Sequence, residues 1–396
     1  MRIIYIEDFF HPEAGYHINL LSKYWTLFGH EVVIFTAEAG KIPKSLTSFF
    51  DYSNIEEKDK EFENRNKVKI ERLPIYCEIS GRAVYKRQIF RKIKQYHPDI
   101  VYCNGNDSLI GMQLVLRSRR SDYGLVLDSH MLKIASQNKF RKIYYALYKR
   151  LITPVICKRK IPVIRTQDDN FIEECLGIPL SMSPFISFGS DTLNFHPDED
   201  SRMTFRNKNN ISKEAFVVIY AGKLNKAKGI ELLREALRSR FPSRREIVFL
   251  IVGTIDSGIN NGDDFFEGCD NRIIRFPTQT YTNLPEFYQA ADIAIFPRQC
   301  SLSFFDVQAC GLPVVFEDNQ LNCIRASYGN ALLFRQGDCE DFRNKIIEFE
   351  SMDPDTFLSV KNSSIRFIKE KYDYRDKAME YIPILESQLN SKRDSQ

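Results

Sequence analysis

The stretch of sequence that most constrains the fold runs from Val217 to Leu237. It opens with four apolar residues, Val217 to Tyr220, whose β-branched side chains are typical of a buried strand. Gly222 ends this strand, and a lysine-rich loop leads to Gly229, after which apolar residues recur at helical spacing. Free backbone N–H groups and the positive end of a helix dipole would meet at this loop. The stretch therefore predicts either a phosphate site or an ordinary loop with solvated lysines.

The rest of the chain repeats this alternation of strand and helix in two halves. The first half is expected to open with a strand at Arg2 to Ile6, then a helix and a second strand at Val32 to Thr36. The second half continues with strands at residues 247–253, 292–297 and 312–316. Such alternation predicts parallel sheets. Because 396 residues exceed the size at which one core usually divides, we expect two domains.

Two further segments carry local expectations. Residues 40–66 are polar and crowded with mixed charge, which is typical of a mobile surface insertion. Residues 83–96 are basic and are expected as a helix. The first loop lacks the pattern G-x-G-x-x-G, which removes the main support for a nicotinamide dinucleotide fold.

Composition limits the class of protein. The net charge of +4 is too small to indicate a nucleic-acid partner by itself. The nine cysteines include no C-x-x-C pair, which favours reduced thiols in the cytosol. Acids occur by the seventh residue, so the N-terminus predicts a strand and not a signal peptide. No apolar run approaches the ~18 residues that span a bilayer.

A histidine follows the predicted strand Gly124 to Leu127, in the sequence Asp128-Ser129-His130. Ligands of open α/β sheets bind outside the carboxyl ends of the strands, which is where His130 would lie. His130 is therefore either a residue of the active site or a packed or surface histidine, and the residues around it leave both interpretations open.

Ten basic residues and no acidic one occur in residues 133–165. Phe140, Tyr144, Leu147 and Leu151 recur there at helical spacing. One interpretation is a core-facing stripe with a solvated basic back. A second is a patch for anionic lipid headgroups, where each nearby base contributes about 1 kcal/mol. A third, nucleic acid, lacks a reading helix or a stacking platform. The ten bases are Lys133, Lys139, Arg141, Lys142, Lys149, Arg150, Lys158, Arg159, Lys160 and Arg165.

Six segments, taken in order, resemble motifs of the retaining glycosyltransferases of family 4, which have the GT-B fold. They are GHEVVIFT, FGSDTLNFHPD, AGKLNKAKGIELL, YQAADIAIFPR, DVQACGLPVV and GNALLFRQGD. The second resembles the interdomain segment N-G-V-D-x-x-x-F-x-P of that family. The third resembles G-R-L-x-x-x-K-G, with lysine in place of the usual arginine. The segments span nearly the whole chain, and the ordered set is more specific than any one of them.

The resemblance implies a GT-B architecture, in which two Rossmann-like parallel-sheet domains face a central cleft. We expect an N-terminal acceptor-side domain at residues 1–187, an interdomain linker at 188–210 and a nucleotide-sugar donor domain at 211–370. A C-terminal helix and tail at 371–396 would pack back on the N-terminal domain.

The resemblance also implies roles for individual residues. Lys223 and Lys228 match the two basic residues that hold the donor pyrophosphate, and His130 matches the histidine near the transferred sugar. These three are the expected catalytic residues. Asp306 matches the second glutamate of the motif E-x7-E, which contacts the donor ribose. The remaining donor-binding residues would be Gly15 in the first loop, Gly222, Ser301, Ser303, and Phe304 and Phe305 through their backbone amides.

The segment before Asp306 departs from the family pattern in two ways. The run from Pro297 to Asp306 is three residues shorter than in the family. The first glutamate of E-x7-E, which usually holds the sugar, has no counterpart, because Arg298 stands in its place. Ser301 and Ser303 would replace some of its contacts. The identity of the sugar is therefore open.

The predicted function is that of a retaining hexosyltransferase. It would move a sugar from a nucleotide-diphosphate donor, such as a UDP-sugar, to a glycan or lipid-linked acceptor in polysaccharide biosynthesis of the cell envelope. Charge grows on the leaving diphosphate, and fixed cations with a helix N-terminus stabilise it without a metal. We therefore expect no cofactor and no metal ion. The protein would be cytoplasmic and peripheral at the inner face of the membrane, would use residues 133–165 there, and would bind no nucleic acid.

Two alternatives remain. A non-catalytic GT-B partner subunit would account for the missing first glutamate. Another GT-B enzyme, such as a nucleotide-sugar 2-epimerase, would share the fold, although the ordered family 4 segments argue against it. The nucleotide, the acceptor, the linkage and the oligomeric state do not follow from the sequence.

Overall fold

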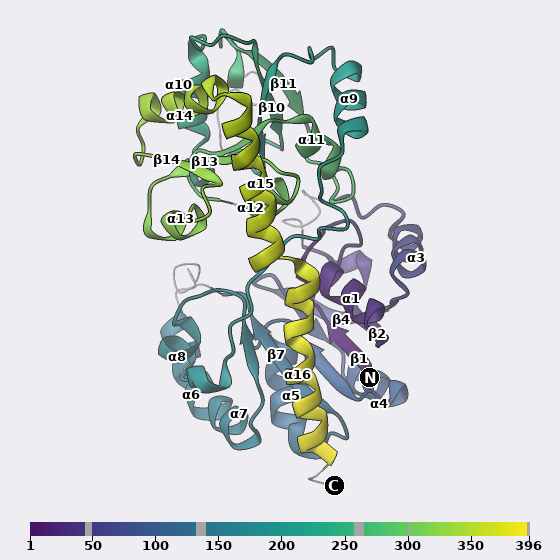
Figure 1. Cartoon of the computed structure of the whole chain (residues 1–396). Coiled ribbons are helices and arrows are strands. Elements are labelled where there is room, and N and C mark those ends of the chain that lie inside the picture. The colour runs from purple at the N-terminus through teal and green to yellow at the C-terminus, as the bar shows by residue number, and fades with distance from the viewer. Residues whose placement is uncertain (44–49, 132–139, 257–264, 301, 394–396) are drawn as a thin grey trace. The chain divides into compact units, whose positions relative to one another are not determined.

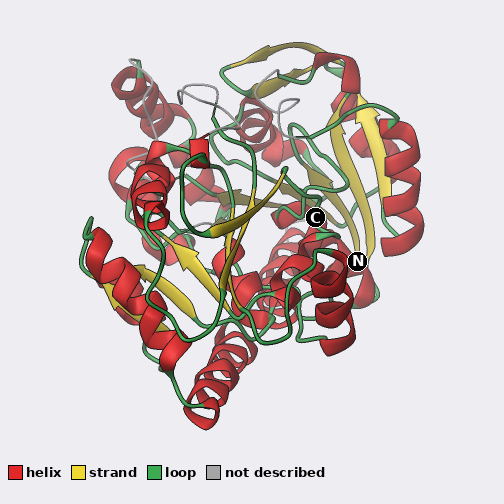
Figure 2. Cartoon of the chain, turned by 90° about the horizontal axis from the view of Figure 1, so that it is seen from above, coloured by secondary structure: helices red, strands yellow, loops and turns green. Residues whose placement is uncertain are grey.

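The computed structural model describes residues 1–43, 50–131, 140–256, 265–300 and 302–393 (Figure 1). The chain divides into two compact units. The first unit comprises Met1–Phe188 together with Arg375–Gln396, and the second comprises Gly189–Tyr374. Each unit is built on a six-stranded sheet with helices on both faces (Figure 2).

The first unit holds a sheet in the order β3-β2-β1-β6-β7-β8, and all neighbouring strands pair in parallel. Strand residues are buried on both faces, as expected of a parallel sheet covered by helices. The strands are β1 (Arg2–Ile6), β2 (Glu31–Ala37), β3 (Lys69–Leu73), β6 (Ile100–Cys103), β7 (Gly124–Ser129) and β8 (Val163–Arg165). A separate antiparallel hairpin consists of β4 (Ile75–Ile79) and β5 (Arg82–Tyr85).

Two helical layers cover this sheet. One layer packs on Ile4, Val33, Val101 and Leu125 and contains α4 (Gln88–Tyr96), α5 (Leu109–Arg117), α6 (Arg141–Leu151), α7 (Thr153–Arg159) and α8 (Phe171–Leu176). The alternate strand residues point to the other face, where Tyr5 and Tyr102 contact Trp25 of α1 (His17–Leu27) and Tyr381 of α16 (Tyr374–Arg393). The remaining helices are α3 (Ile55–Asn66) and the 3₁₀ turns η1 (Ala39–Lys41), η2 (Ser118–Arg120) and η3 (Leu180–Met182).

The second unit repeats the topology in the order β11-β10-β9-β12-β13-β14, again all parallel. Its strands are β9 (Phe216–Ala221), β10 (Ile247–Val252), β11 (Arg272–Phe276), β12 (Ile293–Phe296), β13 (Val314–Glu317) and β14 (Ala331–Phe334). Its helices are α9 (Glu199–Lys208), η4 (Lys226–Lys228), α10 (Ile230–Arg238), α11 (Leu284–Ala290), α12 (Ser303–Ala309), α13 (Gln320–Arg325), α14 (Cys339–Ser351) and α15 (Pro354–Lys371).

The range 188–210, expected as a linker, contains α9, which is fastened to the second sheet by a buried ion network. Asp292, just before β12, accepts hydrogen bonds from Arg202 at 2.7 Å and Arg206 at 2.8 Å. It also accepts the backbone N–H of Val217 at 2.7 Å. Burial opposes the ionised carboxyl, but the two arginines outweigh it and lower the pKa of Asp292. Helix α9 is thus part of the second unit.

Two local expectations are wrong, and one of the interpretations left open for residues 133–165 is excluded. Residues 82–85 form β5, so the helix expected at 83–96 begins only at Gln88. The polar range 40–66 contains α3, whose Ile55, Asp59 and Phe62 are buried at helical spacing. The core-facing interpretation of the stripe on α6 also fails, because Phe140, Leu147 and Leu151 are exposed and only Tyr144 is half-buried.

Candidate functional site

In the second unit, the lysine loop lies where the sequence places it, between β9 and α10. The strand ends at Ala221, and Gly229 at φ +79° begins α10. The Asn225 side chain accepts the backbone N–H of Lys228 at 3.0 Å, which holds the η4 turn. Gly222 and Gly253 pass so close together that a Cβ on Gly253 would collide with the carbonyl oxygen of Gly222. The glycines therefore let two strand ends meet beside the loop.

The three lysines of this loop differ in their surroundings. Lys228 is half-buried, and its Nζ donates to the backbone carbonyl of Cys300 at 3.1 Å. Burial lowers the pKa of Lys228, which means that the fold holds its ammonium at some cost. Lys226 is exposed and lies 3.6 Å from Glu231. Lys223 is exposed on the same loop. Lys228 is therefore the cation that the loop directs inward.

Helix α12 begins beside this loop. The Ser303 hydroxyl donates to the carbonyl of Ala221 at 3.3 Å, which joins the start of α12 to the end of β9. Phe304 and Phe305 are buried, and the backbone N–H of Phe305 donates to the carbonyl of Leu302 at 3.1 Å. Ser301, expected to bind the donor, lies outside the described residues. The structure thus brings together Lys228, Gly222 and Ser303 at the carboxyl ends of β9 and β12.

Asp306 is buried and does not lie open at the surface. Its side chain is only 9% exposed, and Oδ1 accepts the Ser190 hydroxyl at 2.7 Å. Burial raises the pKa of Asp306 to about 7, even though the Ser190 hydrogen bond opposes this shift. Asp306 therefore fastens α12 to the segment that begins the second unit, and its contact with a ribose stays a prediction. Arg298, in the position of the missing glutamate, is exposed.

In the first unit, a polar cluster forms at the carboxyl ends of β1, β6 and β7. His130 is held by the Thr166 hydroxyl, 2.6 Å from Nδ1, and by Asp128, whose Oδ2 lies 3.2 Å from Nε2. Phe188 stacks on the imidazole with ring centroids 5.5 Å apart. Burial disfavours the imidazolium, but the Asp128 carboxylate outweighs burial and raises the pKa of His130. Asp128 in turn accepts the N–H of Gly105 at 2.8 Å.

A second histidine, missed in the sequence, completes this cluster. His17 opens α1 and lies edge-on to His130 with ring centroids 5.2 Å apart. Its Nε2 lies 3.2 Å from the Tyr381 hydroxyl of α16. Burial, together with the neighbouring His130, lowers the pKa of His17 to about 3, so this ring is neutral at physiological pH. His17 and Tyr381 are 364 positions apart, and no local pattern could have paired them.

Two acids line the same edge of the sheet. Glu7 accepts a hydrogen bond from Asn104, and burial raises the pKa of Glu7. Asp8 lies 3.5 Å from Arg82, and burial raises the pKa of Asp8 to about 7 against the effect of that arginine. Gly15, in the first loop, has φ +64°, a left-handed conformation that favours glycine.

The cluster also offers ligand atoms that a cation could bridge. One ligand atom from each of His17, Asp128 and His130 lies within 4.8 Å of the others, and this is the one such group in the part of the chain that the structure describes. Imidazole and carboxylate are ordinary ligands of Zn²⁺. The expectation that no metal is required therefore stays a prediction.

Two doubly wound parallel sheets in one chain define the GT-B class of fold. Solved structures agree along nearly the whole chain. Sucrose-phosphate synthase from Thermosynechococcus elongatus matches with a TM-score of 0.68 and 16% identity over 99% of both chains. A glycosyltransferase from Rickettsia africae matches with a TM-score of 0.72 and 14% identity over 98% of both chains. Anabaena HepE in complex with UDP and glucose matches with a TM-score of 0.68 and 16% identity, over 98% of this chain and 100% of that one. The predicted fold class is confirmed.

At the level of sequence, residues 215–351 match the family described as Glycosyl transferases group 1. Two curated relatives are D-inositol 3-phosphate glycosyltransferases. The relative from Salinispora tropica is 28% identical over 144 residues, which is 32% of this chain and 30% of the relative. The relative from Salinispora arenicola is 29% identical over 123 residues, 28% of each. The chain thus aligns with less than a third of these relatives' length. The family match at residues 215–351 contains the lysine loop and α12.

Proposed function

We propose that the chain is a glycosyltransferase that takes a sugar from a nucleotide-diphosphate donor. The observation that carries this proposal is Lys228, a half-buried ammonium at the junction of the β9 loop and the β12 loop. A fold that keeps a cation at such a place against desolvation has a use for an anion there. The same stretch lies in the region that matches Glycosyl transferases group 1.

The chemistry assigned to this site is stabilisation of the leaving diphosphate. When the bond between the anomeric carbon and the diphosphate breaks, negative charge grows on the phosphate oxygens. Lys228 and Lys223 would neutralise it, and because Lys228 is already held by Cys300 and Asn225, little reorganisation is needed. His130 is proposed to act beside the transferred sugar, and the Asp128 carboxylate, which raises its pKa, favours the charged imidazolium as a hydrogen-bond donor.

The finer features of this proposal rest on the resemblance to family 4. They are a hexosyl donor such as a UDP-sugar, retention at the anomeric carbon, and a glycan or lipid-linked acceptor of envelope polysaccharide synthesis. That Anabaena HepE has been seen with UDP and glucose supports a uridine donor. We also propose that the protein acts as a peripheral protein at the inner face of a membrane. Among the residues that the structure describes, no helix combines the length and apolarity that crossing a bilayer demands.

The test is a panel of UDP-, ADP- and GDP-sugars, each scored for thermal stabilisation of the protein and then for products. A true donor must raise the melting temperature by mass action. Products then separate the alternatives: transfer to an added glycan supports the proposal, and an epimerised nucleotide sugar without acceptor indicates a 2-epimerase. If no nucleotide sugar stabilises the protein, the proposal fails and a non-catalytic partner subunit becomes the better assignment.

A further inference from the structure

One helical layer of the first sheet is rich in bases. In this layer α4, α5, α6 and α7 contain no Asp or Glu, whereas α8 contains Glu173 and Glu174. The helix α3, outside this layer, contains Glu56, Glu57, Asp59, Glu61 and Glu63. The four helices α4 to α7 and the η2 turn contribute the bases Arg91, Lys92, Lys94, Arg117, Arg119, Arg120, Arg141, Lys142, Lys149, Arg150, Lys158 and Arg159. This part of the surface is therefore more basic than the net charge of +4 indicates.

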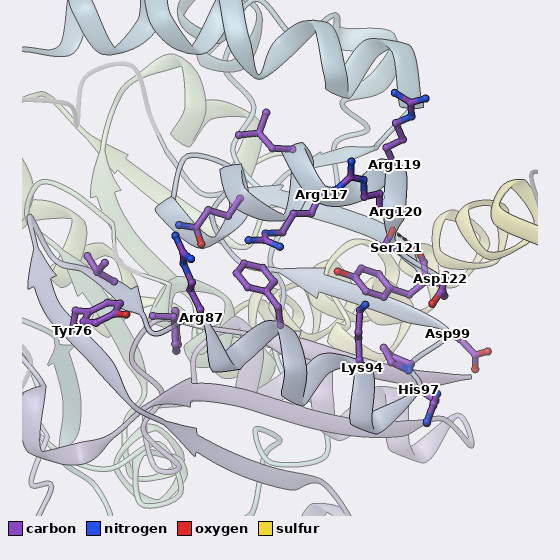
Figure 3. Close-up of a pocket in the computed structure, with 17 residues that line it drawn as sticks. Tyr76, Arg87, Lys94, His97, Asp99, Arg117, Arg119, Arg120, Ser121 and Asp122 are labelled. Carbon is purple, nitrogen blue, oxygen red and sulfur yellow. Dashed lines mark hydrogen bonds between the residues drawn. The ribbon is translucent and has the colours of Figure 1, made fainter.

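A groove of about 1280 Å³ runs between α4 and α5 in this layer (Figure 3). Arg87, Lys94 and Arg117 extend into it from the two helices, and Arg119 and Arg120 stand at one end (Figure 3). Arg117 lies over the ring of Phe90, 4.0 Å from its centroid. Within the described parts of the chain, no ion pair joins any of these five bases to an acid. Two acids, Asp99 and Asp122, line the groove as well, so it presents five bases against two carboxylates and its net charge is positive.

The same helical layer carries an exposed apolar stripe on α6. Ile143, Leu147 and Leu151 are 62%, 53% and 55% exposed. Tyr144, on the neighbouring side of the helix, donates its hydroxyl to the carbonyl of Asp107 at 2.9 Å, just before α5. Because these residues recur every three or four positions, the stripe flanks the side of α6 that turns toward α5. Lys142 and Arg150 are exposed on the same helix.

We propose that this basic face, made of α4, α5 and α6, docks on a bilayer of anionic phospholipid. The groove bases would meet the headgroup phosphates, and the α6 stripe would enter the boundary between headgroups and acyl chains, as amphipathic helices do. Charge complementarity favours an anionic partner, and the large exposed aliphatic side chains beside the bases favour lipid over nucleic acid, which would need stacking platforms. This extends the proposed membrane contact beyond residues 133–165, where Lys133 and Lys139 lie outside the described residues.

The docking proposal does not depend on the transfer reaction, so each can fail alone. The experiment is co-sedimentation of the full chain with vesicles of pure phosphatidylcholine and of equal parts phosphatidylcholine and phosphatidylglycerol. The groove variant Arg119→Gln/Arg120→Gln is compared with Lys60→Gln/Arg65→Gln, exposed bases of α3 that change the net charge equally. Each lost base should weaken binding about fivefold, so the groove variant should lose roughly 25-fold while the α3 variant stays near wild type.

A second variant probes the apolar part. Ile143→Ser/Leu147→Ser keeps every charge and should weaken the binding that persists when salt screens the headgroups. Melting temperatures of all variants verify that these exposed substitutions leave the fold intact. The proposal is overturned if wild type ignores anionic vesicles, if the groove and α3 variants weaken equally, or if duplex DNA or RNA competes as well as the vesicles do.

Discussion

Replacing Lys228 with methionine should weaken donor binding and turnover while leaving the stability of the fold equal or higher. Methionine keeps most of the length of the side chain and removes the charge. Burial lowers the pKa of Lys228, so the free fold holds the charged ammonium unfavourably. The variant should therefore melt at the same or a higher temperature than wild type. Wild-type stability should also rise as pH increases through the lowered pKa toward the ordinary value of about 10.4, and the variant should lack that rise.

The loss of function follows from what the ammonium does in the proposed site. A hydrogen bond to a charged group is worth about 1.5–3 kcal/mol, so the Kd for UDP should rise about 10- to 150-fold. Turnover should fall further, because the charge on the diphosphate is greatest in the transition state; removing one preorganised donor costs about 10²-fold or more in kcat. Calorimetric titration with UDP and initial rates with the stabilising nucleotide sugar measure the two losses.

Lys226→Met provides the matched control. Lys226 belongs to the same η4 turn, but it is exposed and its ion pair with Glu231 is long, at 3.6 Å. Exposed pairs contribute only about 0–1 kcal/mol, so neither UDP binding nor turnover should change by more than a few-fold. The reasoning is refuted if both lysine variants turn over donor like wild type, or if Lys228→Met loses stability and activity together.

Three further outcomes are expected. Asp306→Asn should raise the donor KM and leave the acceptor KM nearly unchanged. In wild type the pKa of Asp306 is higher in the folded than in the unfolded state, so the free energy of unfolding should fall by up to about 4 kcal/mol as pH rises from 4 to 7. The Asn variant should lack this loss. A change confined to the acceptor KM would exclude the ribose role. His130→Gln should lower kcat about 10²-fold, and wild-type kcat should decline as pH rises through the raised His130 pKa, which a flat profile would contradict. Gly253→Ala should cost about 3 kcal/mol or more in urea unfolding, since the new methyl meets the Gly222 carbonyl, and an unchanged midpoint would refute that packing.

The sequence predicted best where one local pattern decides the structure. Apolar β-branched runs gave both parallel sheets, and the glycine-bounded lysine loop lies between β9 and α10 as expected. Helix α3 was not predicted, because the buried positions Ile55, Asp59 and Phe62 recur at helical spacing within a run of mixed charge and include only two apolar residues. The run Arg82–Tyr85 lies beside a basic helix, and only its pairing with β4 makes it a strand.

The candidate sites show the same division. Periodicity grouped Phe140, Tyr144, Leu147 and Leu151 on one side of a helix, but a helical period states only that residues share a side, not whether that side meets a core or solvent. His130 was found because a strand ends just before it. Its neighbours His17 and Tyr381 come from the first and last helices of the chain, and their approach depends on the tertiary fold.

The ion network around Asp292 restricts how this chain can diverge. The carboxylate compensates Arg202 and Arg206 on α9 and also accepts the backbone N–H of Val217, the second residue of β9. Removing one partner of such a network leaves a buried charge unpaired and lowers the free energy of unfolding by about 3–5 kcal/mol. Replacing all members by well-packed apolar side chains can instead leave the stability unchanged. Substitutions in α9 and in the segment before β12 are therefore tolerated only when they occur together. Residues that lie 84 to 90 positions apart in sequence should thus change in concert during evolution.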